Sequence, residues 1–141
     1  MLIRDALESD VDALSELTGR PRDVLRDQIH DRSVRVAVDE EKEGESADDN
    51  GILGFIAFDA QSGTVHVTGF DGKSRAMTRL FEEPRGFGVR EGLDIEVVVP
   101  DDDSRRVETV KDIGFVSVGD GPRFDGRSTT QFRLEVNGED D

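Results

Sequence analysis

The stretch "GILGFIAFDAQSGTVHVTGF", residues 51–70, decides the fold. Residues 52–58 and 64–70 are two runs rich in β-branched, aromatic and small apolar side chains, which favours a pair of strands. Ser62 and Gly63 lie between the runs and indicate a tight turn. The stretch therefore predicts a β-hairpin in the middle of the chain.

The hairpin is followed by "DGKSRAM", residues 71–77, where a strand passes into a helix. The helix is expected over residues 74–90, with a kink at Pro84 because proline removes one helical hydrogen bond. Turns between a strand and a helix often hold phosphate groups, usually through glycines inside the turn. This turn instead carries Lys73 and Arg75.

Two helices are expected before the hairpin. Ser9, with Asp12 three residues later, resembles a capping box, and Gly19 ends the helix that follows. Pro21 suits the first position of a second helix that runs to about residue 29.

One further helix is expected after the hairpin region, with Asp103 or Ser104 as its cap and Gly114 at its end. Outside the hairpin, strands are expected at 3–6, 34–38, 93–99, 115–118 and 129–136. The order βααβββαβαββ predicts an α/β fold with a mixed sheet. We expect one domain over residues 1–138, with an acidic loop at 39–50 and an acidic tail at 139–141.

The net charge of −15 is made mostly of aspartate, with 20 Asp against 13 Glu, while 15 Arg outnumber 3 Lys. Such a charge destabilises a compact state by self-repulsion, and molar salt relieves the repulsion because the Debye length falls to about 3 Å. We therefore expect an extreme halophile as the source. Because phosphates would be repelled, nucleic acid is not expected as a partner.

The chain has no cysteine, so disulfides and thiolate metal sites are excluded. No apolar run is long enough to span a membrane and no signal-peptide pattern is present, so we expect a cytoplasmic protein without membrane contact. The loop "DEEKEGESADDN", residues 39–50, is expected to be solvated and mobile. The alternative is that this loop docks a cation or a basic partner.

Three segments together resemble the GNAT superfamily of N-acetyltransferases: "IRDALESDVDAL" at 3–14, "GILGFIAF" at 51–58 and "VETVKDIGF" at 107–115. The resemblance implies a GNAT-like (acyl-CoA N-acyltransferase) fold, with a mixed central sheet flanked by helices. It also implies transfer of an acetyl group from acetyl-CoA, the co-substrate, to an unidentified amine. A homodimer is possible.

The family's most diagnostic motif reads Val-x-x-x-x-Arg/Gln-x-x-Gly-x-Gly/Ala and is diverged here. With its Val on Val67, the Arg/Gln position falls on Gly72, and the two glycine positions fall on Arg75 and Met77. A family glycine about 17 residues later falls on Gly92, so the spacing is kept. The resemblance implies that the cofactor is bound by Val67, Gly72, Lys73, Ser74, Arg75, Ala76 and Met77. It also implies that the strands separate near Val67 and Val97 to leave a cleft.

Two interpretations of the turn stay open. Arg75 and Met77 add bulk where a phosphate would approach the backbone. However, residues 72–81 carry three cations and no acid, which favours an anion site rebuilt with arginine. In the alternative, these cations pair with Glu82 and Glu83.

The catalytic residues are not assigned. The family's acid is a tyrosine, and this chain has none. His66 shares a strand face with Thr64 and Thr68 and could act as a base, as could Glu96, although each could equally be structural.

The sequence patterns of other kinds of functional site are not matched in this chain. "GFG" at 86–88 does not follow a strand, and "DDD" at 101–103 is expected to cap a helix rather than bind a metal. His30 and His66 lack metal-ligand spacing, so no metal is expected. The sequence also contains no nucleophile elbow. Two alternatives to an acetyltransferase remain: a non-catalytic GNAT-fold binding or regulatory module, and a structural protein that binds no CoA.

Overall fold

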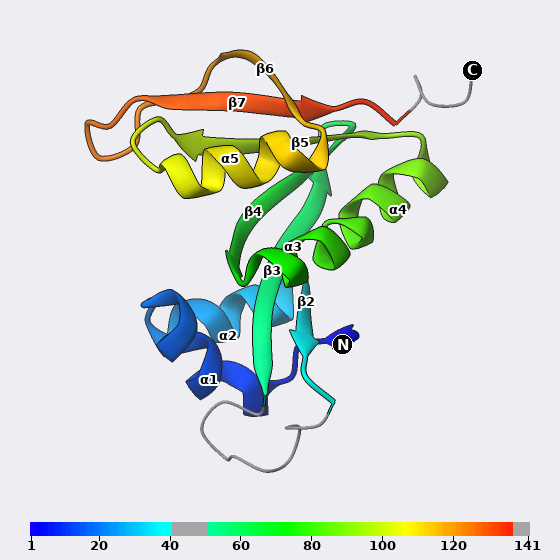
Figure 1. Cartoon of the computed structure of the whole chain (residues 1–141), viewed down its shortest axis with the longest axis vertical. Helices are drawn as coiled ribbons and strands as arrows, with labels where there is room; N and C mark the ends of the chain where they lie inside the picture. The colour runs from blue at the N-terminus through cyan, green and yellow to red at the C-terminus, as the bar shows by residue number, and fades with distance from the viewer. Residues whose placement is uncertain (41–50, 137–141) are drawn as a thin grey trace. The chain divides into compact units, whose positions relative to one another are not determined.

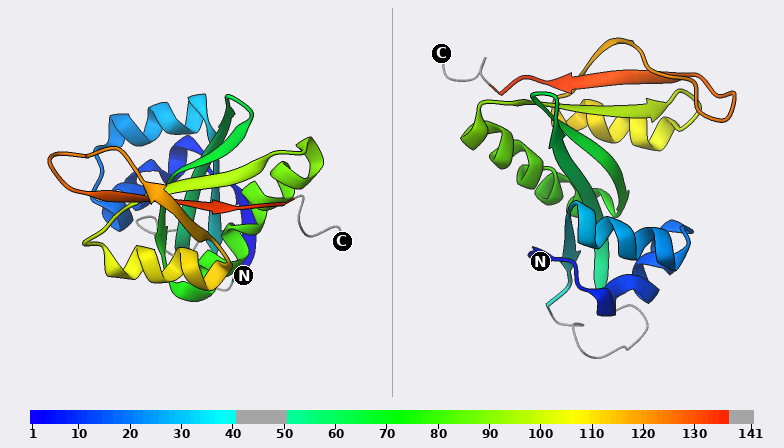
Figure 2. Two further views of the ribbon diagram at one scale, coloured as in Figure 1. Left: turned by 90° about the horizontal axis from the view of Figure 1, so that it is seen from above. Right: turned by 180° about the vertical axis from the view of Figure 1, so that it is seen from behind.

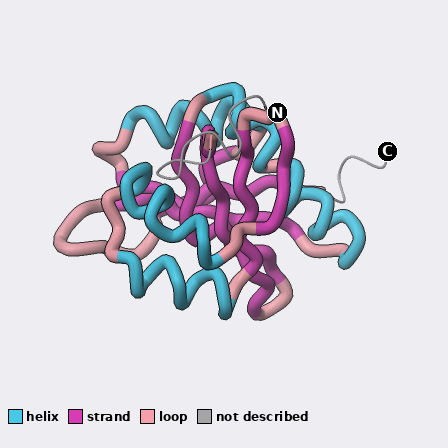
Figure 3. Tube along the Cα trace, turned by 90° about the horizontal axis from the view of Figure 1, so that it is seen from below, coloured by secondary structure: helices cyan, strands magenta, loops and turns pink. Residues whose placement is uncertain are grey.

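The computed structural model describes residues 1–40 and 51–136, which contain the elements in the expected order (Figures 1 and 3). The strands are β1 (Leu2–Asp5), β2 (Ser33–Val38), β3 (Ile52–Gln61), β4 (Thr64–Gly72), β5 (Asp94–Pro100), β6 (Val116–Asp120) and β7 (Thr129–Leu134). The helices are η1 (Glu8–Asp10), α1 (Val11–Thr18), α2 (Arg22–Asp31), α3 (Ser74–Leu80), α4 (Glu82–Glu91) and α5 (Ser104–Ile113).

The strands follow the order β1-β2-β3-β4-β5-β7-β6. β4 and β5 pair in parallel, whereas the β1–β2, β2–β3, β5–β7 and β6–β7 pairs are antiparallel. The sheet is therefore mixed, as the sequence predicts. The chain divides into two compact units: unit 1 holds Met1–Asp59 and Gly69–Glu83, and unit 2 holds the rest.

Unit 1 has helices on both faces of its strands. α1 and α2 pack on the face that carries Val36, Phe55 and Ala57, all at most 1 % exposed (Figure 2). α3 covers the opposite face, where Met77 and Leu80 lie against Gly54. Burial of this apolar surface is what holds these short helices in place.

The first helical segment begins differently from the prediction. The expected Ser9–Asp12 cap is wrong. Asp10, which is 1 % exposed, accepts hydrogen bonds from the Leu7 N–H at 2.8 Å and from Arg4 Nη1 at 2.8 Å. A buried carboxylate needs such partners, and Asp10 has both a cation and a backbone donor. The expected end of α1 is confirmed, because Gly19 adopts φ 74° as its C-cap. Pro21 is the N-cap of α2, one residue before the first helical position that the sequence predicts.

The helix expected over 74–90 is two helices, α3 and α4, so the predicted single kinked helix is wrong. The break lies at Phe81, three residues before Pro84. A proline ring clashes with the carbonyl of the residue four positions earlier, which here is Leu80, the last residue of α3. Pro84 itself falls in the first turn of α4, where its missing N–H removes no helical bond.

Unit 2 packs its helices on one face of its strands. α5 lies along β5 (Figure 1), and α4 approaches Ile95 through Gly88, where an added Cβ would lie 2.9 Å from the Ile95 Cδ1. The turn at Ser62 and Gly63 has φ of 54° and 76°, values that match a tight hairpin turn. Asp103 caps α5 by accepting from the Arg106 N–H, as expected.

Most of the acidic loop predicted at 39–50, and all of the tail predicted at 139–141, lie outside the described residues. Asp39, the first residue of the predicted loop, donates its N–H to the Gly51 carbonyl at 2.8 Å. Within residues 1–40 and 51–136, no helix is long and apolar enough to cross a bilayer.

Candidate functional site

The parallel ladder between β4 and β5 is short. Its register runs from Thr64–Asp94 to Val67–Val97, whereas β4 continues to Gly72 and β5 to Pro100. The pairing therefore ends at the residues where the sequence predicts that the strands separate. Val67, the first predicted cofactor residue, is 6 % exposed.

Gly72 is fixed by the backbone of β3. It has φ 135°, and an added Cβ would lie 2.4 Å from the Gly54 Cα and 2.5 Å from the Leu53 oxygen. The Lys73 N–H then donates to the same Leu53 carbonyl at 2.9 Å. No side chain fits at Gly72 in this arrangement.

The predicted cofactor residues that follow Gly72 divide by exposure. Lys73, Ser74 and Arg75 are exposed, whereas Ala76 and Met77 are 0 % and 3 % exposed. The expectation that Met77 adds bulk at the phosphate position is wrong, because its side chain packs beside Gly54 in the core of unit 1. Only Arg75 lies on the surface in place of a family glycine.

The cations of this segment have no acidic partner in the described part of the chain. Lys73, Arg75 and Arg79 are exposed, and their side chains make no ion pair or hydrogen bond with residues 1–40 or 51–136. Glu83 instead accepts from Arg35 Nε at 3.1 Å. The alternative in which these cations pair with Glu82 and Glu83 is therefore wrong. We name Lys73, Arg75 and Arg79 the cationic cluster.

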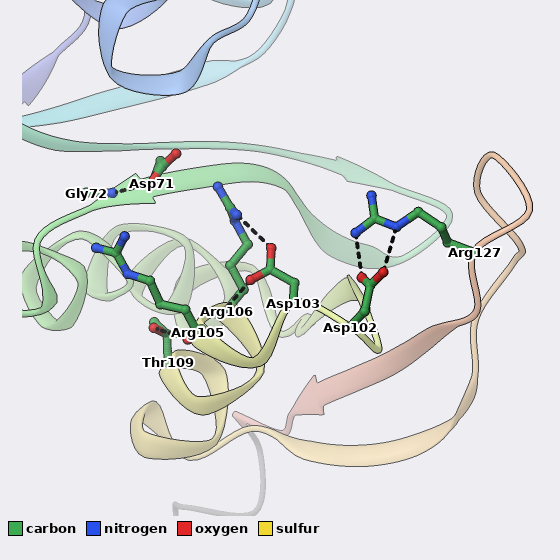
Figure 4. A network of polar contacts seen from close by, with 8 residues as sticks. All are labelled: Asp71, Gly72, Asp102, Asp103, Arg105, Arg106, Thr109 and Arg127. Atoms are coloured by element: carbon green, nitrogen blue, oxygen red, sulfur yellow. Dashed lines mark hydrogen bonds and ion pairs between the residues drawn. The ribbon is translucent and has the colours of Figure 1, made fainter.

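One acidic residue, Asp71, lies in the chain just before the cationic cluster. Asp71 Oδ1 accepts a hydrogen bond from the Gly72 N–H at 2.8 Å (Figure 4). This carboxylate occupies one amide of the turn that an anion could otherwise use. Since α3 has only seven residues, the charge that the turn offers to an anion comes mainly from side chains.

Glu96, a candidate base, is held in an ion pair. Its side chain accepts from Gln131 Nε2 at 2.7 Å and from Arg133 Nε at 2.9 Å, and the residue is 8 % exposed. The hydrogen bond from Arg133, followed by the charge of Glu96, raises the pKa of Arg133. Because both carboxylate oxygens of Glu96 are engaged by protein donors, Glu96 fits a structural role better than that of a base.

His66, the other candidate base, lies where the sequence predicts. It is half-buried on β4 and stands opposite Glu96 in the parallel ladder. Its ring makes no hydrogen bond with the described residues, so the protein itself does not occupy the ring nitrogens there. This leaves His66 as the candidate base with an available acceptor nitrogen.

The three aspartates after β5 all have protein partners, but only Asp103 caps a helix as the sequence predicts. Asp101 accepts from the Thr130 hydroxyl. Asp102 accepts from Arg127, and Asp103 from Arg106 (Figure 4). The hydrogen bond from Arg127 holds the pKa of Asp102 below its ordinary value. Among the described residues, no group of histidines and carboxylates could hold a metal ion.

Sequence reasoning missed Arg20, which lies in the turn between α1 and α2. Its guanidinium reaches β4, and an added Cβ at Gly69 would lie 3.0 Å from both Nη atoms. No sequence motif links the two positions, because Gly69 is 49 residues away and belongs to a different element.

Neither models of protein families nor curated proteins match this chain. Solved structures do match. The ribosomal-protein-S18-alanine N-acetyltransferase from Escherichia coli is 12 % identical, with a TM-score of 0.71, and the match covers 96 % of this chain and 93 % of that one. Chaetomium thermophilum Naa20, solved with a bisubstrate analogue, is 11 % identical, with a TM-score of 0.77 and coverage of 97 % and 87 %.

A GNAT superfamily phosphinothricin acetyltransferase from Sinorhizobium meliloti, solved in complex with acetyl-CoA, is 15 % identical, with a TM-score of 0.66 and coverage of 94 % and 86 %. Identities this low establish the fold alone. The predicted fold class is confirmed: the chain has a GNAT fold, with a mixed seven-stranded sheet flanked by helices.

Proposed function

We propose that this protein is an acetyl-CoA-dependent N-acetyltransferase that acts on an amine still to be identified. The observation that carries the proposal is the cationic cluster, in which Lys73 precedes α3 and Arg75 and Arg79 lie within it. All three are exposed and have no acidic partner in the described part of the chain. In a chain with a net charge of −15, such a cluster favours an anionic ligand. The GNAT fold, which a structure with bound acetyl-CoA shares, favours CoA as that ligand.

The residues fit this cofactor in a specific way. Arg75 and Arg79 are one helical turn apart, so both guanidinium groups can approach one phosphate group from the same side of α3. Lys73 adds a third charge at the start of the helix, and Gly72 fixes the position of the turn against β3. The cofactor supplies the activated thioester, while these side chains hold its phosphates.

The acceptor amine must lose a proton when its nitrogen attacks the acyl carbon. We propose His66 as the group that accepts this proton, because its ring is not engaged by the described residues and it precedes Val67, where the β4–β5 ladder ends. With no tyrosine in the chain, the leaving thiolate has to take its proton from another donor, such as water.

One observation favours a second candidate, a GNAT-fold module that binds without catalysis. Asp71 holds the Gly72 amide at the entrance to the cationic cluster, and its negative charge opposes an incoming phosphate. A protein that had lost the ability to bind CoA would tolerate this acid. In a transferase, the positive charge of arginine has to offset the negative charge of Asp71.

Turnover distinguishes the two candidates. The wild-type chain is incubated with acetyl-CoA and a mixture of primary amines, and thiol release is followed together with the mass of the products. The assay uses molar KCl, because we also propose that the protein works in a salt-rich cytoplasm. Amine-dependent thiol release that falls at least about tenfold in His66→Gln supports the transferase. Cofactor binding without turnover would support the non-catalytic module.

A further inference from the structure

Strand β6 forms an exposed edge of the sheet. Among the described strands it pairs with β7 alone, and it stands last in the order β5-β7-β6 (Figure 1). All five of its residues, Val116–Asp120, are exposed. An edge strand presents backbone N–H and C=O groups with which a further strand can pair. The edge at β6 is therefore open to another strand.

The composition of β6 differs from that of the rest of the surface. Residues 113–119, with the sequence IGFVSVG, carry no charge in a chain in which 36 % of the residues are charged. Val116 and Val118 are nevertheless 59 % and 52 % exposed. An uncharged apolar segment on an otherwise highly charged surface is typical of a contact with another molecule.

The other edge strand of the sheet is protected by charge. β1 also ends the strand order, but it carries Arg4 and Asp5, and Asp5 pairs with Arg35 at 3.0 Å. Charged side chains on an edge oppose pairing with a second strand. In β6 the only charged residue is Asp120, the last of the strand. Of these two edges, β6 is therefore the one suited to pairing.

The centre of β6 is the residue that β7 engages least. The register between the two strands shifts between Ser117 and Gly119, so Val118 has no residue opposite it in β7. The extra residue of such a bulge is left out of the ladder. Val118 is thus both exposed and unmatched within the sheet.

We propose that two copies of this chain pair through β6, antiparallel about a two-fold axis at Val118, so that the sheet of one copy continues into that of the other. Centring the pair there lets all five residues of both strands overlap. Val116 then lies opposite Asp120, and Ser117 opposite Gly119, so the two Asp120 carboxylates lie at opposite ends of the pair.

Charge favours a second copy as the occupant. Two chains that each carry a net charge of −15 repel each other, so they approach most easily through a segment that carries almost no acid. An identical strand matches β6 in length and keeps the two single charges apart, and molar salt screens the remaining repulsion. The inference does not depend on the proposed acetyltransferase activity.

The test measures the oligomeric state by size exclusion with light scattering in molar KCl, over a series of protein concentrations. The wild type is expected to be a dimer. Val118→Glu and Val118→Lys each place two like charges directly opposite each other, and each is expected to raise the dissociation constant at least about tenfold. An equimolar mixture of the two variants sets opposite charges across the axis. It is expected to recover a dimer, in which a tag on one variant retains the other.

Val89→Glu is the matched control, because Val89 is an exposed valine of α4 whose replacement is expected to leave the dimer intact. Hydrogen exchange of the Val116–Asp120 amides needs no variant, and protection that rises with protein concentration supports the pairing. A wild type that stays monomeric at every concentration overturns the inference and leaves β6 to a different partner. A dimer that both Val118 variants keep, or a mixture that does not recover one, overturns it as well.

Discussion

Replacing Gly72 by alanine is expected to be among the most damaging small substitutions in unit 1. The added Cβ would lie 2.4 Å from the Gly54 Cα and 2.5 Å from the Leu53 oxygen, and both are backbone atoms that cannot turn aside. The φ of 135° adds strain of about 1–3 kcal/mol. Forced separation of two packed strands adds about 1–3 kcal/mol. We therefore expect a loss of about 2–6 kcal/mol in the free energy of unfolding.

Urea denaturation in molar KCl measures this loss. Gly63→Ala is the matched control, because Gly63 has φ 76° but no atom within 4 Å of the added Cβ, so only the strain remains. If Gly72→Ala does not accumulate, Gly54→Ala replaces it, since its closest contact is the flexible end of Met77 at 2.9 Å. Equal losses for Gly72→Ala and Gly63→Ala would show that the close approach of β3 and β4 at this point is wrong.

Three further predictions concern packing, pH and salt. Met77→Ala is expected to cost about 2–4 kcal/mol of stability, because the side chain is 3 % exposed, and to leave CoA affinity unchanged; denaturation and calorimetry check both. Asp102→Asn is expected to lower Tm near neutral pH. Because Arg127 depresses the pKa of Asp102, the difference from wild type should vanish as the pH falls below 3.8, and a constant difference would contradict the ion pair. Thermal melts are expected to rise from about 0.2 M to about 2 M KCl, since salt screens the charge of −15; an unchanged Tm would refute the halophilic interpretation.

Element order and most boundaries were predictable because the signals are local. The turn at Ser62 and Gly63, the glycine after α1 and the aspartate before α5 all act within a few residues of themselves. The helix break was predicted at the wrong residue for a local reason too. The ring of Pro84 clashes with the carbonyl of Leu80, so the helix ends there rather than at Pro84 itself.

The site was less predictable because its geometry depends on contacts between distant segments. The motif spacing predicts residues 72–77 as the cofactor segment, but the burial of Met77 depends on Gly54, and the fixed position of Gly72 depends on Leu53. Likewise, the sequence does not reveal that Glu83 pairs with Arg35. The cations near Glu83 therefore do not have this acid as a partner. The contact between Arg20 and Gly69 joins two elements that no sequence period relates.

The most direct test of the proposed function is a calorimetric titration of CoA into the protein in molar KCl. The wild type is expected to bind, and Lys73→Ala with Arg75→Ala is expected to weaken binding by about 2–4 kcal/mol, the usual effect of losing two charge-assisted contacts. Arg90→Ala, which removes an exposed arginine from α4, is expected to bind like the wild type. Equal affinities for all three proteins would contradict the role of the cationic cluster, and no binding by the wild type would contradict the acetyltransferase itself.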